Sequence, residues 1–282
     1  MPLTAPCLWV AATPLGNPDD LSPRTREVLS SVSLVLAEDT RRALRLFQAC
    51  GITAHRVASF HEHNEKKRQE GVLRLLRQGH AVALVSDAGT PLLADPGFRL
   101  VQACRAEGIK VSPLPGPSAP AAALSAAGIA PLPYSFLGFL PRDAAGRRAL
   151  FSVFASVPGS LVFFERKNRL KSSLKQAAAL LGPRDVAICR ELTKTHEDFI
   201  LFRLENSADI PDDLRGEITV VIGPPEEETR SSASEVERLL RRELAQGGKP
   251  RQVVRRVQSA VRGWTGKEVY ALLSAANTPH GS

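Results

Sequence analysis

Several features are scarce or missing in this chain of 282 residues, and each absence excludes a class of protein. Aromatic residues make up only 5% of it, and no internal repeat is evident. The four cysteines, Cys7, Cys50, Cys104 and Cys189, form no C-x-x-C pair. Such scattered cysteines indicate neither a disulfide framework nor a zinc site, so we expect reduced, buried thiols and no metal.

Long apolar runs and targeting signals are also missing. No apolar run approaches the roughly 20 residues that a membrane-spanning helix needs. The first five residues, MPLTA, lack the basic region and apolar core of a signal peptide. We therefore expect a cytoplasmic protein that does not associate with the membrane.

The composition that is present is typical of a globular α/β protein, with 43% hydrophobic and 23% charged residues. Thirty-seven Lys and Arg residues against 29 Asp and Glu residues give a net charge of +8. A basic balance favours a polyanionic partner such as nucleic acid, because each neutralised phosphate releases a bound counterion. Charge alone does not establish such a partner, because many basic proteins bind nothing anionic.

Short β-rich apolar runs alternate with helical patterns, which predicts parallel, helix-covered sheets. The expected strands are residues 8–12, 34–37, 81–86, 110–114, 160–165, 185–190 and 217–223. The expected helices are residues 25–32, 41–50, 65–77, 98–107, 118–127 and 170–181. Pro and Gly residues at 113–117 and an acidic, Pro- and Ser-containing stretch after Pro224 mark the boundaries. We expect one α/β domain at 1–114, a second at 115–225, a linker at 226–232 and a helical module at 233–282.

The C-terminal module is expected to hold three short helices, at 236–245, 251–261 and 267–275, the last capped by Thr265. Residues 233–277 contain nine Lys and Arg residues against four Asp and Glu residues, a net of +5. Such a module resembles a helix-turn-helix and makes Arg251, Arg255 and Arg256 candidate RNA contacts. A helical dimerisation or packing module is the alternative.

Three loops rich in small residues follow predicted strands: TPLGN at 13–17, SDAGTP at 86–91 and PGPSA at 115–119. Ligands bind at the carboxyl ends of strands in open parallel sheets. The first loop is not G-x-G-x-x-G, which argues against a nicotinamide site. Asp87 is suited either to accept hydrogen bonds from an amine or ribose hydroxyl, or to cap the next helix. Ser118 can cap the helix after it, whose first N–H groups suit a polar ligand group.

Together these loops resemble the cofactor loops of the tetrapyrrole methylase superfamily, the class III methyltransferases. Four further segments point to one branch of it: AEDTR at 37–41, SFHEHN at 59–64, GFLPR at 138–142 and RELTKTHE at 190–197. That branch methylates the ribose 2′-hydroxyl of a cytidine in the decoding region of 16S rRNA. The resemblance covers roughly residues 8–275 and implies a two-domain α/β fold, S-adenosylmethionine in an interdomain cleft and a homodimer.

The resemblance also implies cofactor contacts, and the residues matched most directly are Leu15, Asp87, Thr90, Ser118 and Ala119. Looser matches fall on Phe164 (or the adjacent Glu165), Cys189 and Glu217. The first loop has fewer glycines than its counterpart in the tetrapyrrole enzymes, which weakens the case for a corrin substrate.

Methyl transfer to a hydroxyl needs no metal, but the reacting atoms must be aligned and the hydroxyl must lose a proton. We rank His61, Glu191 and Lys194 first for that role, ahead of His63, Glu38, Asp39 and His196. The alternatives are a solvated histidine loop, and an ion pair between Lys194 or His196 and a neighbouring glutamate.

Basic and aromatic residues beside these segments are candidates for RNA contact. Arg142, Arg147, Arg148 and Arg166 suit phosphate binding, which positions RNA without reading its sequence. Phe60, Phe136 and Phe139 suit stacking on an extruded base, although such phenylalanines are more often core residues.

Three other functions compete with the RNA methyltransferase. The same cofactor cleft serves a corrin or porphyrin-precursor methylase, or a diphthine synthase-like enzyme that acts on protein. The third alternative is an RNA-binding protein with a vestigial cleft. The basic tail and the Arg- and His-containing loops favour RNA as the substrate.

Overall fold

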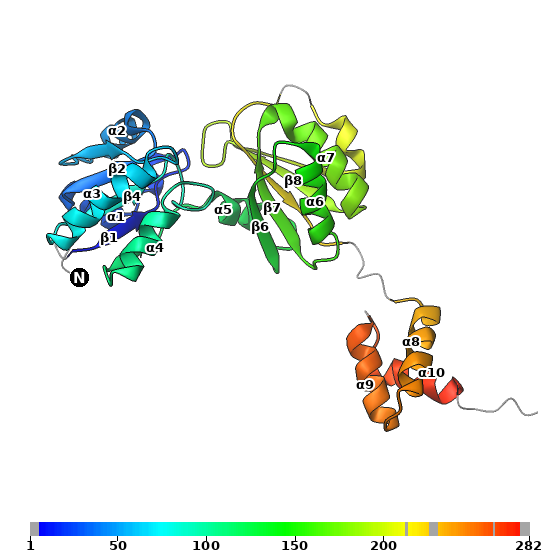
Figure 1. Ribbon diagram of the computed structural model, residues 1–282. Coiled ribbons are helices and arrows are strands. Elements are labelled where there is room, and N and C mark those ends of the chain that lie inside the picture. Colours follow the sequence, from blue (N-terminus) through cyan, green and yellow to red (C-terminus); the bar gives the residue numbers. More distant parts are fainter. Residues whose placement is uncertain (1–5, 212–213, 226–230, 262, 277–282) are drawn as a thin grey trace, which may run out of the picture. The chain divides into compact units, whose positions relative to one another are not determined.

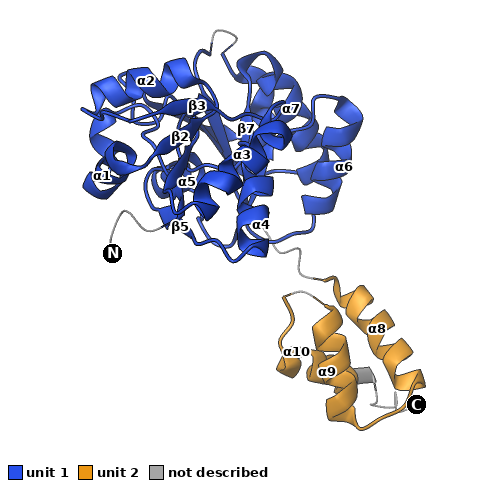
Figure 2. Cartoon of the chain, turned by 60° about the vertical axis from the view of Figure 1, so that its left-hand side comes forward, with its two compact units in different colours: residues 1–224 blue, residues 225–282 orange. Residues whose placement is uncertain are grey.

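The protein, represented by a computed structural model, is described at residues 6–211, 214–225, 231–261 and 263–276. The chain divides into two compact units, residues 1–224 and 225–282 (Figures 1 and 2). The first unit contains two five-stranded sheets, and the described part of the second is helical. The first five residues and positions 226–230 of the expected linker lie outside the described residues.

The first sheet has the strand order β3-β2-β4-β1-β5, and every neighbouring pair in it is parallel. Its strands are β1 (Leu8–Ala11), β2 (Leu34–Ala37), β3 (Val57–Ser59), β4 (Val82–Val85) and β5 (Val111–Leu114). Parallel neighbours need long crossovers, which α1 (Pro23–Ser31), α2 (Thr40–Ala49), α3 (Glu65–Arg77) and α4 (Phe98–Ala106) provide. A short 3-10 helix, η1 (Pro18–Asp20), precedes α1.

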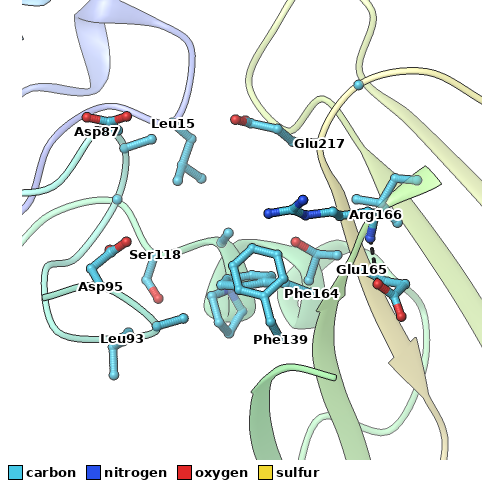
Figure 3. A pocket seen from close by; sticks show the side chains of 18 of the residues that line it. Leu15, Asp87, Leu93, Asp95, Ser118, Phe139, Phe164, Glu165, Arg166 and Glu217 are labelled. Carbon is cyan, nitrogen blue, oxygen red and sulfur yellow. Dashed lines mark hydrogen bonds between the residues drawn. The ribbon is translucent and has the colours of Figure 1, made fainter. Parts of the chain in front are cut away.

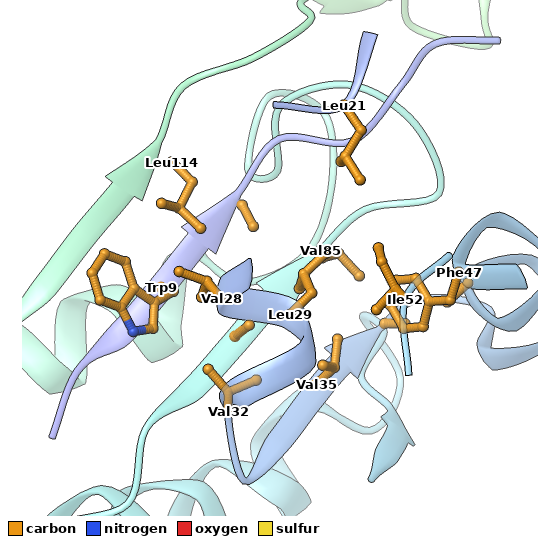
Figure 4. Close-up of a cluster of buried hydrophobic side chains, with 14 of the residues drawn as sticks. Trp9, Leu21, Val28, Leu29, Val32, Val35, Phe47, Ile52, Val85 and Leu114 are labelled. Carbon is orange, nitrogen blue, oxygen red and sulfur yellow. The ribbon is translucent and has the colours of Figure 1, made fainter. Parts of the chain in front are cut away.

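Successive side chains of these strands enter two different hydrophobic cores. Trp9 and Val85 pack on the side of α1 and α2, where they meet Leu29 (Figure 4). Leu8 and Leu84 pack on the opposite side, against residues of α3 and α4. Because both faces are buried, β1, β2 and β4 are continuous apolar runs, and this is why the sequence predicted them.

The second sheet has the order β6-β7-β10-β8-β9. Its strands are β6 (Tyr134–Phe139), β7 (Ser160–Glu165), β8 (Asp185–Arg190), β9 (Asp198–Arg203) and β10 (Ile218–Ile222). Only β6 and β7 pair in parallel, while the other three pairs are antiparallel. The expectation of parallel sheets is therefore wrong here, because β8 and β9 are joined by a short turn that only an antiparallel pair permits.

Helices cover both faces of the second sheet. α5 (Ala119–Ala126) packs Ala123 and Leu124 on one face, and α6 (Ala144–Phe154) and α7 (Lys167–Leu181) cover the other. A second 3-10 helix, η2 (Leu204–Asp209), contacts α7. Four elements, α6, β3, β6 and β9, were not predicted from the sequence.

The second unit comprises α8 (Ala233–Ala245), α9 (Pro250–Ala260) and α10 (Gly266–Ala276), which share a core around Val236, Val253 and Val257. The predicted cap of the last helix is confirmed. Thr265 Oγ1 accepts the Glu268 N–H at 3.3 Å, and the Glu268 carboxylate accepts the Thr265 N–H at 2.7 Å. Across the described ranges, no helix is both long and apolar enough to cross a membrane.

The packing in Figure 4 predicts how two leucines differ on truncation. Leu29 is 0% exposed in the core beneath α1, whereas Leu44 on α2 is 54% exposed. We expect Leu29→Ala to lower the free energy of unfolding by about 2–4 kcal/mol through the cavity it leaves. Leu44→Ala is the matched control and should change it by less than about 0.5 kcal/mol. Urea unfolding measures both, and equal effects would contradict the assignment of this core.

Candidate functional site

The three small-residue loops meet at the carboxyl ends of their strands. Thr13 and Gly89 form an isolated antiparallel bridge, with N–H···O distances of 2.9 and 3.0 Å. The Thr90 hydroxyl donates to the Pro117 carbonyl at 3.0 Å. Gly89 has a φ of +77°, and a Cβ there would lie 3.1 Å from the Leu15 side chain. The loops therefore form one connected floor, with a glycine where backbone must approach side chain closely.

A cleft of about 770 Å³ opens above this floor, a volume within the range of small-molecule sites. Figure 3 shows Leu15, Asp87, Asp95 and Ser118 on one side of it and Arg166 and Glu217 on the other. The two sides come from the connections of the first and the second sheet. The lining also includes Glu38, Arg42, Thr90, Leu93, Ala119, Phe139, Phe164 and Thr219.

Seven of the eight residues predicted to contact the cofactor line this cleft: Leu15, Asp87, Thr90, Ser118, Ala119, Phe164 and Glu217. The eighth, Cys189, is 0% exposed in the core of the second sheet, and burial raises its pKa to about 12. Its neighbour in register on β10, Thr219, lines the cleft instead.

Asp87 does not cap the following helix, which was one of its two expected roles. Its Oδ1 accepts the Asp39 N–H at 3.1 Å, and its Oδ2 pairs with Arg42 Nη1 at 3.1 Å. α4 begins instead after Gly97, without a side-chain cap. Ser118 stands at the N-cap position of α5, but its side chain makes no capping hydrogen bond. The side chains of Asp87 and Ser118 thus both belong to the cleft wall.

Three carboxyl groups, from Glu38, Asp87 and Asp95, line one wall of the cleft, where Arg42 pairs with Asp87. Burial, followed by the charges of Glu38 and Asp87, raises the pKa of Asp95 to about 7. Burial and the Asp87 charge also raise the pKa of Glu38. Such a wall favours a cationic ligand, because a positive charge relieves the mutual repulsion of the carboxylates. Sequence reasoning missed Asp95, and the only signal was its place in the same strand-to-helix connection as Asp87.

The opposite wall of the cleft carries the basic side chain of Arg166, which directly precedes α7. Arg166 is exposed, and its guanidinium extends into the cleft in Figure 3. Glu165 beside it is buried, and its carboxylate accepts the Arg166 N–H at 2.7 Å and the Ser173 hydroxyl at 2.6 Å. Arg169 completes this carboxylate's shell through an ion pair. The start of α7 is thereby fixed, and with it the base of the Arg166 side chain.

Of the residues predicted to bind RNA in the first unit, some are exposed and one is buried. Arg142 and Arg148 are exposed, as is Arg166. Arg147 is only 7% exposed, and its guanidinium donates to Gln176 and to two backbone carbonyls. Those carbonyls belong to Pro141 and Arg142, so Arg147 holds the backbone that carries Arg142 and is not itself available to a phosphate.

In the second unit, Arg251 and Arg255 are exposed on α9. Arg256 is engaged internally, since it donates to the Glu243 carboxylate at 2.8 Å, and to the carbonyls of Glu243 and Gly247. It thus closes the turn between α8 and α9. Of the three arginines of α9 predicted to contact RNA, Arg251 and Arg255 are therefore the two that face outward.

None of the three residues predicted to be catalytic lines the cleft. His61 Nε2 lies 3.0 Å from Asn64 Nδ2, so its ring is engaged within its own loop. Lys194 Nζ donates to Glu191 Oε1 at 3.0 Å and to Glu217 Oε2 at 2.8 Å. Lys194 and Glu191 are therefore tied to Glu217, which lines the cleft, without lining it themselves.

The three phenylalanines considered for stacking differ in their exposure to the cleft. Phe60 is 0% exposed and belongs to the core. Phe139 is 54% exposed and lines the cleft, with its ring 5.3 Å from that of Phe164. Phe136 packs edge-on against the same Phe164 ring at 5.0 Å. Of the three, only Phe139 presents an aromatic surface to the cleft.

Comparison with known proteins identifies the family. A model of the tetrapyrrole (corrin/porphyrin) methylases matches residues 7–208. The chain is 43% identical over 269 residues to ribosomal RNA small subunit methyltransferase I of Micromonospora olivasterospora, an alignment that covers 93% of this chain and 86% of that one. It belongs to the ribosomal RNA small subunit methyltransferase I family. The member of this family from Pseudomonas aeruginosa is 48% identical over 196 residues, which cover 69% of each chain.

Solved structures extend the likeness to the fold. Uroporphyrin-III C-methyltransferase from Thermus thermophilus, complexed with S-adenosylhomocysteine, superposes with a TM-score of 0.55 at 19% identity. That alignment covers 77% of this chain and 96% of that one. The resemblance and the α/β fold expected from the sequence are confirmed, and membership of the ribosomal RNA small subunit methyltransferase I family makes this chain a methyltransferase.

The raised pKa of Asp95 predicts a specific dependence of stability on pH. Because the folded protein binds the Asp95 proton up to about pH 7, this group's contribution to stability is lost as the pH rises through 7. Asp95→Asn removes the titrating carboxyl group and with it this loss of stability at high pH. We expect it to be more stable than the parent at pH 8 by about 1–2 kcal/mol, after allowance for solvent screening, and equal to it near pH 4. Urea unfolding at both pH values measures this, and a gain that is the same at both would contradict it.

Proposed function

We propose that this methyltransferase transfers a methyl group from S-adenosylmethionine to the ribose 2′-hydroxyl of a cytidine in the decoding region of 16S rRNA. The observation that carries the proposal is the 43% identity to a ribosomal RNA small subunit methyltransferase I across 93% of the chain. The cleft above the three bridged loops supports it, because its residue types suit the cofactor on one side and a polyanion on the other.

The cleft fits S-adenosylmethionine in volume, shape and charge. The cofactor has a sulfonium and an ammonium group, and the wall of Glu38, Asp87 and Asp95 offers carboxyl groups to such cations. Leu15 and Phe164 offer apolar surface for its adenine ring. Gly89 keeps open the space that a Cβ would fill against Leu15, at 3.1 Å. We therefore assign the cofactor to the seven predicted residues that line the cleft, with Glu38 and Asp95 added.

When bound, the cofactor supplies a methyl group on a positively charged sulfur. The chain's own contribution is to align the acceptor oxygen with that methyl group and to accept a proton from the acceptor. Asp95 suits proton transfer, since it lines the cleft and has a pKa of about 7. Arg166, on the facing wall, suits stabilisation of the oxygen as negative charge develops on it.

We propose that rRNA phosphates bind the basic surface beside this wall, through Arg142, Arg148 and Arg166. The support is geometric. Arg147 and Arg169 donate to the carbonyls of residues 140–142 and so hold the segment that carries Arg142 beside the start of α7. We assign a second, sequence-independent contact to Arg251 and Arg255 of α9.

We propose the division expected from the sequence as the functional one: domains at 1–114 and 115–225, a linker at 226–232 and a basic module at 233–282. We also propose a homodimer that acts in the cytoplasm, where ribosomal RNA is found. Exposed apolar residues support the dimer, since Leu132, just before edge strand β6, and Tyr134, its first residue, are 75% and 45% exposed.

Labelled cofactor tests the proposed substrate. The full-length protein would be incubated with S-adenosylmethionine carrying a labelled methyl group, in parallel with small ribosomal subunits, naked 16S rRNA, a corrin precursor and elongation factor. We expect label on the subunits or on the 16S rRNA alone. Label confined to the corrin or to the protein would overturn the proposal, and so would binding of rRNA with no label on any acceptor.

Removal of the second unit separates RNA binding from cofactor binding. We expect the chain truncated after residue 224 to bind S-adenosylhomocysteine as tightly as the full chain, because the whole cleft lies in the first unit. Its affinity for rRNA should fall and depend less steeply on salt, since fewer phosphates are neutralised. The double variant Arg251→Gln/Arg255→Gln should reproduce the salt effect in the full chain. An unchanged salt dependence in both would contradict an RNA contact by α9.

A further inference from the structure

The turn between β8 and β9, residues 191–197, is held in a strained conformation. Two of its non-glycine residues lie in the left-handed region, Glu191 with a φ of +47° and Thr193 with a φ of +64°. Its backbone closes on itself, since the Lys194 N–H donates to the Glu191 carbonyl at 2.9 Å. The Thr193 N–H also donates to the Glu197 carboxylate at 2.6 Å. Such strain persists only where surrounding contacts fix it, and it gathers at functional sites.

Consecutive residues of the first cofactor loop contact this turn. Leu15 packs in the same hydrophobic cluster as Leu192, which is 8% exposed. The Asn17 N–H donates to Thr193 Oγ1 at 3.2 Å. Between them, the Lys194 stem covers Gly16 so closely that a Cβ there would lie 2.1 Å from Lys194 Cγ. Only glycine therefore fits beneath the Lys194 side chain.

The charged end of Lys194 is bound on the other side of the cleft. Its Nζ donates to Glu191 Oε1 and to Glu217 Oε2, and Glu191 Oε1 also accepts the Glu217 N–H at 2.8 Å. Gly216 leaves room for this arrangement, since a Cβ there would lie 2.4 Å from Glu191 Oε1. Burial lowers the pKa of Lys194, but the hydrogen bonds that it donates to Glu217 and Glu191 outweigh burial and raise that pKa overall. The amine is thus fully charged at neutral pH and has no free lone pair with which to accept a proton.

We propose that Lys194 is a positioning residue for cofactor binding: its stem fixes the first loop over Gly16, and its amine fixes Glu217 on the opposite wall. Leu15 and Glu217 both line the cleft, so one side chain sets the separation of two cofactor-binding positions. The sequence analysis ranked Lys194 and Glu191 among the catalytic candidates, and the geometry assigns them this different role. The inference rests on the proposed function, because it takes the cleft to bind S-adenosylmethionine.

Three substitutions in the full-length chain test the role. Lys194→Met keeps the stem over Gly16 and removes the charge, Lys194→Arg keeps the charge, and Gly16→Ala displaces the stem. Lys175→Met, on the exposed face of α7, is the matched control. S-adenosylhomocysteine binding would be measured by calorimetry, and kcat and the KM for the cofactor by methyl transfer to small subunits.

We expect Lys194→Met and Gly16→Ala to weaken S-adenosylhomocysteine binding and raise the cofactor KM about tenfold, because both displace cleft residues that contact the cofactor. Their kcat at saturating cofactor should stay within about twofold of the parent, since no group that takes part in the chemistry is lost. Lys194→Arg should recover most of the affinity, and Lys175→Met should match the parent. If Lys194→Met fails to fold, Gly16→Ala still tests the positioning role, because it displaces the Lys194 stem while leaving the lysine in place.

Two results would overturn the inference. One is a fall in kcat of about 100-fold or more with unchanged cofactor affinity, which marks a group that acts on the reacting atoms. The other is unchanged affinity in both Lys194→Met and Gly16→Ala. Failure of the parent chain itself to bind S-adenosylhomocysteine would instead refute the proposed function, so the two failures are distinguishable.

Discussion

The cleft depends on a short backbone bridge between Thr13 and Gly89. These residues follow different strands of the first sheet, and their two hydrogen bonds join the first loop to the second. The Thr90 hydroxyl then joins the second loop to the third through the Pro117 carbonyl. Loops are usually the least fixed parts of an α/β fold. Here each is bonded to the next, so residues from three distant segments keep one arrangement around a ligand.

Above that floor, charged side chains line both walls of the cleft. Carboxyl groups gather on the side of the first sheet, where mutual repulsion and burial raise the pKa of Asp95 to about 7. Arg166 lies on the side of the second sheet, and the interior Arg147 holds the backbone that carries the exposed Arg142. The site thus offers carboxyl and guanidinium groups to the proposed cofactor and RNA substrate, which agrees with membership of an rRNA methyltransferase family.

Much of the fold could be predicted from the sequence because most of its strands are buried on both faces and so are unbroken apolar runs. The elements that were missed lack this signal. β6 is only partly buried and contains Gly138 and a register shift, and β9 has no fully buried residue at the sheet edge. The antiparallel pairing was missed because chain order alone does not reveal that a seven-residue turn reverses direction between β8 and β9.

The site was predicted where it depends on residues adjacent to a strand end, as with Leu15, Asp87 and Ser118. It was not predictable where it depends on distant segments coming together. Burial and the charge of Glu38, far away in the sequence, raise the pKa of Asp95, and Cys189 lies buried in the core of the second sheet. Arg147 has the same residue type and neighbourhood in the sequence as Arg148, and only the packing of α6 separates interior from surface.

Mass spectrometry of the methylated nucleoside tests the central claim most directly, because it reports the acceptor atom. Small subunits treated with this chain and deuterated S-adenosylmethionine would be digested to nucleosides, and the label located on base or sugar. A cleft that aligns a ribose hydroxyl with the methyl donor predicts label only on the ribose of cytidine, at one position of 16S rRNA. Label on a base, or on many nucleosides without preference, would contradict the account.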